Sequence, residues 1–245
     1  MNDAITAHDL EVRYGKRCIF ADLSFALQAG TFTALVGPNG AGKSSLLRVL
    51  AGVQKPAAGE IVAEGRAALI DSAVPPPGDV TPHELAGYGM AIRRPFWRFQ
   101  PDANELLVTE RALADCALSA RAHDAVKTLS AGEAQRAWIA AGLATQPAVL
   151  LIDEPTAHLD LKFQLEVADT LARLARTGVA VMAAFHDLTL AGRACDAVAL
   201  LAHGEIRLGE PDSILQPKLL SDAFGVRVST YRSADGGPLV CAVVS

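Results

Sequence analysis

The chain has 245 residues, of which 51% are hydrophobic and 20% are charged, and its formal net charge is −5. This length allows one large domain, or a domain with an inserted subdomain, with a substantial core. The acidic balance argues against general affinity for nucleic acid, so we expect no nucleic-acid partner. No apolar run approaches the roughly 20 residues that span a bilayer.

The amino-terminal stretch and the cysteines are typical of an intracellular protein. Residues 1–6 have neither a basic region nor an apolar run, so no secretory signal is predicted. The cysteines are scattered, without the spacing of metal ligands: Cys18, Cys116, Cys195 and Cys241. We therefore expect reduced thiols in a cytoplasmic protein rather than a disulfide framework.

The first part of the chain alternates short apolar runs with turns. Residues 7–14 have period-two character, and a turn follows at Gly15 and Lys16. Residues 18–27 are predicted to be the next strand pair, before a turn at residues 28–30. Together these segments predict an antiparallel β layer.

Residues 37–44, Gly-Pro-Asn-Gly-Ala-Gly-Lys-Ser, fit the phosphate-binding P-loop pattern G-x-x-x-x-G-K-[ST]. The motif follows residues 31–36, an apolar and partly β-branched run that predicts a buried strand. It precedes residues 44–51, which predict the first turns of a helix. A glycine loop between a strand and a helix is the context that the motif requires.

The residue types of this loop suit a bound triphosphate. Glycines allow a tight turn whose successive N–H groups form a nest for anionic oxygens, and the helix start adds its positive dipole. We expect Lys43 at the β- and γ-phosphates and Ser44 at Mg²⁺. Tyr14 lies where an aromatic ring can stack on adenine, although a plain edge-strand tyrosine is the commoner case. The predicted nucleotide contacts here are Tyr14, Gly37, Pro38, Asn39, Gly40, Ala41, Gly42, Lys43, Ser44 and Ser45.

Beyond the P-loop helix, two short strands are predicted at residues 60–64 and 66–70. The composition then changes: residues 74–78 form a proline-rich connector, and residues 81–145 are rich in Ala and Leu with charges at helical spacing. Residues 93–99 are basic and aromatic, and we expect a loop or a protein contact there rather than a nucleic-acid site.

These boundaries predict an α/β fold: a P-loop NTPase core with an antiparallel β layer and an inserted helical subdomain. We interpret residues 1–245 as one domain. Its α/β core comprises residues 1–72 and 146–245, and its helical subdomain comprises residues 73–145.

Residues 149–154 form a continuous apolar run that ends in two carboxylates. Such a run is typical of a strand in a parallel sheet, whose carboxyl end is where ligand chemistry is placed. We expect Asp153 to hold Mg²⁺ through water and Glu154 to polarise the attacking water. His186 ends the next buried run and is expected to hold the water and Glu154 in line. A solvated strand end and a structural histidine are the alternatives.

The remaining segments complete the core. They are an amphipathic helix at residues 161–176, strands at 179–185, 198–201 and 205–208, a helix at 213–224, and a terminal hairpin of residues 226–231 and 238–244 around a turn at 235–237.

A further segment, Leu-Ser-Ala-Gly-Glu-Ala-Gln-Arg at residues 129–136, lies between the P-loop and the carboxylates. With the other motifs in this order, nearly the whole chain resembles the ATP-binding-cassette (ABC) ATPases. Residues 129–136 resemble the signature sequence of that family, residues 155–160 its D-loop, and His186 its switch histidine. Without the resemblance, residues 129–136 predict only a helix with Ser130 as N-cap.

The resemblance implies a head-to-tail dimer with two composite ATP sites. Each ATP would lie between the P-loop of one copy and the signature sequence of the other. Ser130, Gly132, Glu133 and Asp160 are thereby implied as further nucleotide contacts.

Four shorter segments are similar to the ATPase subunits of importers for iron-siderophore chelates, haem and cobalamin: residues 136–140, 156–161, 185–191 and 224–228. That similarity implies an ATPase working as a homodimer with two transmembrane permease subunits and, indirectly, an extracytoplasmic binding protein. It would lie peripherally on the cytoplasmic face of the inner membrane. The alternatives are a soluble ABC ATPase acting on a macromolecular assembly, the energy subunit of an exporter, and a non-catalytic nucleotide sensor.

Two departures from the family pattern stand out. Ala131 replaces the usual glycine of the signature sequence, and alanine is small enough for the site to survive. The glutamine expected after the strand ending near Ile70 is missing: Asp71 and Ser72 stand there, and Gln100 lies far along the helical insert. In the family that glutamine touches Mg²⁺ and hinges the helical subdomain, so its loss bears on coupling more than on nucleotide binding.

Overall fold

The computed structural model describes residues 2–71, 79–91, 97–98, 100–232 and 239–243. Its strands are β1 (Asp3–Tyr14), β2 (Arg17–Gln28), β3 (Phe32–Val36), β4 (Ala58–Ala63), β5 (Ala67–Asp71), β6 (Val149–Asp153), β7 (Ala180–Ala184), β8 (Ala197–Ala202), β9 (Glu205–Gly209), β10 (Val228–Arg232) and β11 (Leu239–Val243). Its α-helices are α1 (Lys43–Leu50), α2 (Pro82–Ala91), α3 (Ala103–Asp115), α4 (Ala131–Ala144), α5 (Leu161–Arg176), α6 (Leu188–Ala194), α7 (Pro211–Ile214) and α8 (Pro217–Phe224), and 3₁₀ turns lie at Ser119–Arg121 and Val126–Thr128.

A six-stranded sheet in the order β5-β6-β7-β3-β8-β9 forms the centre of the molecule. All its neighbouring strands are parallel except β8 and β9. The strands β3 and β7 are buried along their whole length, because apolar layers cover both faces of the sheet. The prediction that residues 149–154 form a strand of a parallel sheet is confirmed. The parallel pairing places the carboxyl ends of β3, β6 and β7 at one edge of the sheet.

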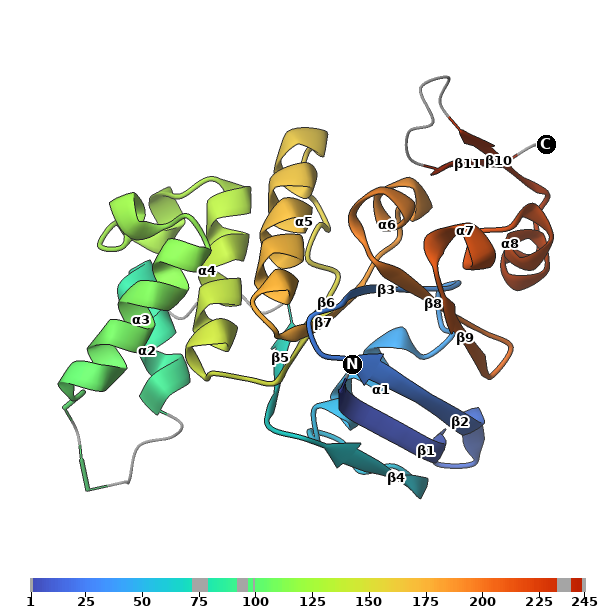
Figure 1. Ribbon diagram of the computed structural model, residues 1–245, viewed down its shortest axis with the longest axis horizontal. Helices are drawn as coiled ribbons and strands as arrows, with labels where there is room; N and C mark the ends of the chain where they lie inside the picture. The colour runs from blue at the N-terminus through green and yellow to red at the C-terminus, as the bar shows by residue number, and fades with distance from the viewer. Residues whose placement is uncertain (1, 72–78, 92–96, 99, 233–238, 244–245) are drawn as a thin grey trace.

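The predicted antiparallel layer is the three-stranded sheet β2-β1-β4 (Figure 1). Its apolar face packs with α1 against the central sheet and forms a second core on that side. The prediction of a strand pair within residues 18–27 was wrong, because these residues belong to the single strand β2. The register with β1 shifts between its pairs, and Asp22 has a φ of 58°, so a local irregularity replaces a chain reversal.

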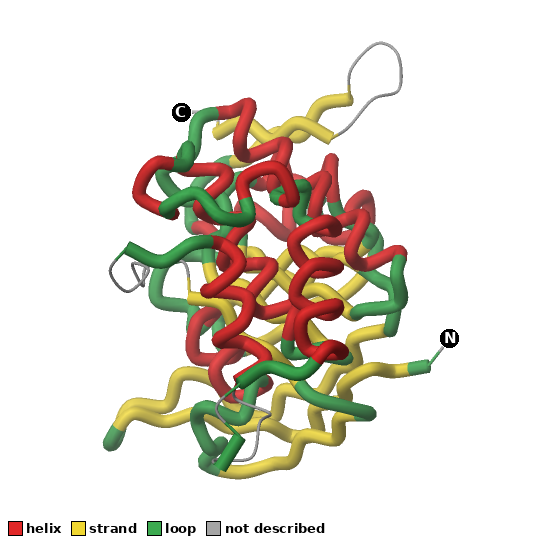
Figure 2. The backbone as a smooth tube through the Cα atoms, turned by 90° about the vertical axis from the view of Figure 1, so that its left-hand side faces the viewer, coloured by secondary structure: helices red, strands yellow, loops and turns green. Residues whose placement is uncertain are grey.

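The helices of the predicted insert, α2, α3 and α4, pack on one another beside the central sheet (Figures 1 and 2). The closest approach is between α2 and α4, where a Cβ at Gly89 would lie 2.2 Å from the carbonyl oxygen of Ala141. Helix α4 also contacts α5 and β5, which ties this group to the core. The boundaries of the helical subdomain, at residues 73 and 145, stay a prediction.

The carboxyl-terminal part differs from expectation in one place. Residues 213–224 were predicted as one helix, but the structure has two, α7 and α8. Pro217 begins α8, and a proline inside a continuous helix would remove a hydrogen bond and clash with the preceding turn. The predicted terminal hairpin is confirmed as the antiparallel pair β10 and β11.

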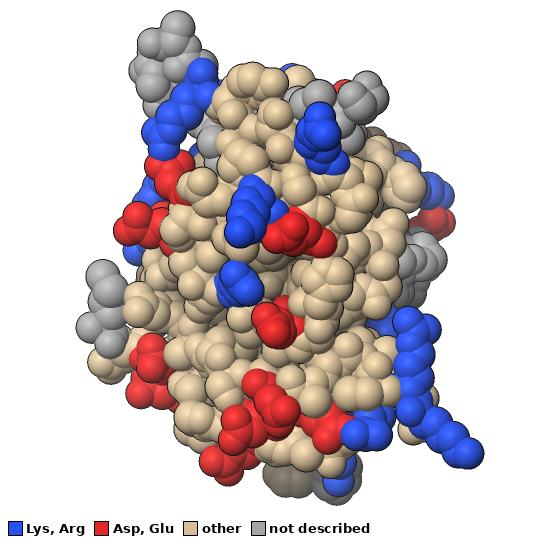
Figure 3. All heavy atoms as spheres, turned by 90° about the vertical axis from the view of Figure 1, so that its right-hand side faces the viewer, with Lys and Arg blue, Asp and Glu red and all other residues tan. Residues whose placement is uncertain are grey.

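The surface on the side of α8 carries charges of both signs (Figure 3). Basic and acidic side chains are mixed over this face, and acidic side chains gather along its lower edge.

Several predictions concern residues outside the described ones: the connector at 74–78, most of the basic run at 93–99, Ser72, and the turn at 235–237.

Three cysteines are described as free thiols, Cys18 exposed and Cys116 and Cys195 buried. Burial raises the pKa of the Cys116 thiol to about 12. Within the described residues, no helix has the length and apolar character needed to cross a membrane.

Candidate functional site

The P-loop connects the buried strand β3 to helix α1 along a path that two of its glycines make possible. Gly37 has a φ of 153°, and a Cβ there would lie 2.1 Å from the carbonyl oxygen of Leu201. Gly42 is left-handed with a φ of 104°, and a Cβ there would lie 2.6 Å from Cγ2 of Ile19. A side chain at either position would therefore displace the loop from the edge of the sheet.

The start of α1 is open to an anion. Its N-cap residue is Gly42, which has no side chain to bond the first N–H groups, and no acidic residue lies in the first turn. The unpaired N–H groups and the helix dipole therefore form a positive site at the end of β3.

Lys43 is the buried cation of this loop, with only 7% of the residue exposed. Its Nζ donates hydrogen bonds to the carbonyl oxygens of Gly37, at 2.8 Å, and Pro38, at 3.2 Å. Burial lowers the pKa of Lys43, while the charges of Glu154 and Asp153 raise it. The loop thus holds the Lys43 side-chain nitrogen at the site where an anionic ligand would bind.

Asp153 at the end of β6 lies beside Ser44 at the start of α1. Burial raises the pKa of Asp153, and a hydrogen bond from the Ser44 side chain lowers it. The other oxygen, Oδ1, is buried and has no hydrogen-bond partner among the described residues. A carboxylate oxygen without a partner next to a hydroxyl fits Mg²⁺, which takes oxygen ligands and keeps several waters.

The described residues hold no group of three or more His, Cys, Asp or Glu side chains able to bind a metal. Ser44 and Asp153 therefore fit a cation that takes its remaining ligands from phosphate and water, as Mg²⁺ does at nucleotide sites.

Glu154 and His186 meet, although 32 positions separate them in the sequence. They follow the neighbouring parallel strands β6 and β7, and Nε2 of His186 lies 2.6 Å from Oε1 of Glu154. Glu154 has a φ of 51°, and both side chains remain about half exposed. The carboxylate is thus positioned by a histidine where water can reach it.

Several of these groups line one cavity of about 310 Å³. It is lined by Arg17, Ile19, Asn39, Gly40, Gly42, Lys43, Ser44, Ser45 and Glu154. The cavity therefore brings part of the predicted P-loop together with the predicted carboxylate Glu154. It is not lined by the predicted site residues Tyr14, Gly37, Pro38, Ala41, Asp153 and His186. Arg17 and Ile19 were missed. From the sequence, this strand was predicted to begin at Cys18, whereas β2 begins at Arg17, and its period-two alternation puts Arg17 and Ile19 on one face.

Tyr14 ends β1 next to this cavity. Its hydroxyl lies 3.1 Å from Oγ of Ser45 and donates to Oε1 of Gln54 at 2.9 Å. The residue is 47% exposed. The ring is thus tied to the start of α1, and its stacking on adenine stays a prediction.

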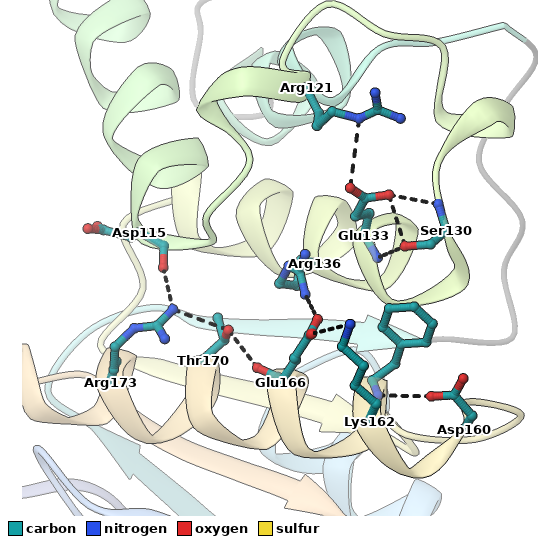
Figure 4. A network of polar contacts seen from close by, with 11 residues as sticks. Asp115, Arg121, Ser130, Glu133, Arg136, Asp160, Lys162, Glu166, Thr170 and Arg173 are labelled. Atoms are coloured by element: carbon teal, nitrogen blue, oxygen red, sulfur yellow. Dashed lines mark hydrogen bonds and ion pairs between the residues drawn. The ribbon is translucent and has the colours of Figure 1, made fainter.

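The segment of residues 129–136 lies elsewhere, at the start of α4, and contributes nothing to the lining of that cavity. Ser130 caps α4: its Oγ accepts from the N–H of Glu133 at 3.3 Å, and Oε2 of Glu133 accepts from the N–H of Ser130 at 2.8 Å (Figure 4). The hydrogen bonds that the N–H and the hydroxyl of Ser130 donate to the carboxylate lower the pKa of Glu133. The single chain therefore shows the capped helix start that the residues alone predicted.

Helix α5 lies against this segment. A Cβ at Gly132 would be 2.8 Å from Cδ1 of Phe163, so the two helices touch at a glycine. Asp160 caps α5 by accepting from the N–H of Phe163 at 3.1 Å. Nη1 of Arg136 lies 2.9 Å from Oε2 of Glu166, which joins the helices a second time (Figure 4).

Comparison with known proteins identifies this arrangement. The sequence profile of the family described as "ABC transporter" matches residues 20–157, more than half of the chain. The chain belongs to the ABC transporter family. It is an ATP-binding subunit of that family, an ATPase coupled to transport, so the resemblance given by the motifs is confirmed.

Its relatives in the ABC family align over almost the whole chain. It is 33% identical to the hemin import ATP-binding protein HmuV of Rhodopseudomonas palustris (strain BisB5), over 98% of this chain and 97% of that protein. It is 34% identical to the ferric enterobactin transport ATP-binding protein FepC of Escherichia coli (strain K12), over 91% and 88%. A solved structure of a metal-chelate type ABC transporter in an inward-facing conformation superposes with a TM-score of 0.90 at 24% identity, covering 100% of this chain and 98% of that one. This likeness confirms the fold.

Asp71, which stands near the position of the missing family glutamine, lies beside Asp153, one of the two residues that fit Mg²⁺. Asp71 ends β5 and pairs in register with Asp153 of β6. Nη2 of Arg48 lies 3.6 Å from Oδ2 of Asp71. Asp71 adds a charge that raises the pKa of Asp153, and Arg48 lowers it. Gln100 is exposed and precedes α3.

Proposed function

We propose that this chain hydrolyses MgATP as a head-to-tail homodimer and energises a membrane importer for an iron chelate, haem or cobalamin. The observation that carries the proposal is the cavity at the P-loop. A buried Lys43, the open start of α1, and the Glu154 carboxylate held by His186 all border the same space.

Each residue has a role in the proposed reaction. The P-loop N–H groups and Lys43 bind the β- and γ-phosphates, and Tyr14 stacks on the adenine. Ser44 and Asp153 would hold Mg²⁺, which neutralises charge on those phosphates when bound. Glu154 accepts a proton from the attacking water, and His186 fixes the orientation of Glu154 through their 2.6 Å contact. Little covalent chemistry is asked of the protein beyond this positioning.

The second half of each site is proposed to come from the partner copy. In one chain the cavity has no lining residue from 129–136, which supports a site completed in trans. Ser130, Gly132 and Glu133 of the partner would contact the γ-phosphate, and Asp160 would be a further nucleotide contact. In this arrangement residues 73–145 act as the helical subdomain and residues 1–72 with 146–245 as the core.

The importer class rests on the relatives, whose names describe hemin import and ferric enterobactin transport. We propose two transmembrane permease subunits and an extracytoplasmic binding protein as partners. The chain would lie peripherally on the cytoplasmic face of the cell membrane. Which iron chelate or tetrapyrrole is carried would be decided by those partners.

The test is transport in vesicles. The chain is reconstituted with its proposed permease partners, and ATP is enclosed on the side of this subunit. Uptake of haem, ferric siderophore and cobalamin is then measured with the binding protein outside. The matched control is Glu154→Gln, which should assemble equally well and transport nothing. ATP-dependent movement in the opposite direction would favour an exporter. Steady ATP hydrolysis with no membrane partner would favour a soluble ABC ATPase.

A further inference from the structure

A second basic side chain borders the P-loop cavity. Arg17 lines the same space as Gly40, Lys43 and Ser44. It is exposed, and among the described residues no side-chain hydrogen bond or ion pair involves it. The acidic residue of the lining, Glu154, is already in contact with His186. The charge of Arg17 is therefore available to a ligand.

The hairpin of β1 and β2 determines where Arg17 stands. Arg17 pairs in register with Tyr14 across the turn, and directly opposed residues of antiparallel strands lie on the same face. Ile19 follows Arg17 by two positions and shares that face. Tyr14 contacts Ser45, and Ile19 contacts the P-loop at Gly42. The face that carries Arg17 is thus fixed on the P-loop on both sides of this residue.

The two cations of the cavity occupy different depths. Lys43 is buried and bonded to the carbonyl oxygens of Gly37 and Pro38. Arg17 reaches the cavity from its exposed rim, next to Tyr14. A guanidinium offers a planar fork of donors that matches two phosphate oxygens, whereas an ammonium acts as a point charge. An extended nucleotide with its terminal phosphates at Lys43 would bring its α-phosphate to the rim.

We propose that Arg17 binds the α-phosphate of the nucleotide and so acts as a second phosphate-binding cation, separate from Lys43. This inference rests on the proposed nucleotide site. Because ATP and ADP both carry the α-phosphate, Arg17 strengthens the binding of both to the same extent. Because Arg17 is exposed, its contribution falls as ionic strength rises.

The experiment measures the affinity of the full chain for MgADP and for the Mg²⁺ complex of a non-hydrolysable ATP analogue by titration calorimetry. The variants are Arg17→Gln, Arg17→Lys and Lys16→Gln, the last removing an exposed neighbouring charge outside the cavity lining. Thermal unfolding of each variant checks that the fold is retained. We expect Arg17→Gln to weaken both nucleotides about tenfold at low salt, Arg17→Lys to recover part of the loss, and Lys16→Gln to change little.

The outcomes separate this inference from the proposed function. If wild type binds nucleotide strongly and Arg17→Gln binds as well as Lys16→Gln, the role of Arg17 is overturned but the proposed nucleotide site is not. Weaker binding of the triphosphate but not of ADP overturns the α-phosphate assignment and moves the contact to the γ-phosphate. A folded wild type that binds neither nucleotide overturns the proposed nucleotide site, and this inference with it.

Discussion

Two helix starts in this chain are proposed to meet phosphate, and they are built in opposite ways. At the start of α1 the N-cap is a left-handed glycine, the first turn has no acid, and no side chain bonds the free N–H groups. At the start of α4, Ser130 and Glu133 bond each other's backbone in a capping box. The first start is ready for an anion, whereas the second is closed by its own residues.

The difference gives a physical reason for the proposal that each site is assembled from two copies. A phosphate at α4 must replace or share the bonds of Ser130, and an N-cap of this kind is worth about 1 kcal/mol. The anionic side chain of Glu133 also stands at this helix start, with its pKa lowered by the bonds to Ser130. The nucleotide is therefore expected to bind first at α1, and α4 to engage it only when the dimer closes.

The largest effect is expected from a variant that stops hydrolysis while ATP stays bound between the start of α1 in one copy and the start of α4 in the other. Glu154→Gln keeps the shape of the side chain but loses the charge that accepts a proton from water, so hydrolysis should fall about 10³-fold. ATP binding should persist, and the dimer should accumulate. Phosphate release and size-exclusion chromatography with ATP measure the two effects. Hydrolysis at the wild-type rate would exclude Glu154 as the water-orienting group.

The next largest effect is expected from a variant that changes only the phosphate site at the start of α1. Lys43→Ala removes the buried cation and should weaken MgATP binding by roughly 100-fold, since charge-assisted hydrogen bonds contribute about 2 to 3 kcal/mol. Calorimetric titration of the chain measures it, with Lys16→Ala as a surface-charge control. Equal affinities in wild type and Lys43→Ala would contradict the role given to this lysine.

The α4 side is tested by comparing two capping boxes. Ser130→Ala and Asp102→Ala each remove an N-cap, at α4 and at α3 respectively, and each should lower the free energy of unfolding by about 1 kcal/mol. Only Ser130→Ala should also lower ATP hydrolysis, because only Ser130 is proposed to contact a nucleotide. Denaturant unfolding and ATPase rates are compared for both. An equal loss of hydrolysis in both variants would reduce Ser130 to a structural cap.

The smallest effect concerns the missing glutamine. Ser72→Gln should change the Mg²⁺ concentration that supports half-maximal ATPase by less than about twofold, because Mg²⁺ readily keeps several waters as ligands. Any larger effect should appear in how uptake follows hydrolysis in vesicles. If wild type with its permease lacks Mg²⁺-dependent hydrolysis and Ser72→Gln has it, the glutamine was required.

The sequence predicted the parts of the site whose position depends on one strand end. Lys43 and Ser44 follow β3, and Asp153 and Glu154 end or follow β6, so an apolar run and the residues after it were sufficient. Arg17 was missed because its place in the cavity depends on how a hairpin lies over the P-loop. The neighbourhood of Asp71 and Asp153 was missed because it depends on the pairing of strands far apart in the chain.

Other errors came from local chemistry that competes with a regular pattern. The helical spacing of residues 213–224 hid the break at Pro217, where the ring cannot continue a helix. The strand pair predicted within residues 18–27 is the single strand β2, which accommodates the positive φ of Asp22 as a local irregularity.

Gly132 and Phe163 have a mechanical consequence. The ring of Phe163 packs against Gly132, which has no side chain, and the Arg136–Glu166 pair joins the same two helices one turn further on. Ser130, which caps the start of α4, and Asp160, which caps the start of α5, therefore lie at the same end of one packed helix pair. In the proposed dimer, a displacement of one helix start would carry the other with it, and this would mechanically couple the two nucleotide sites.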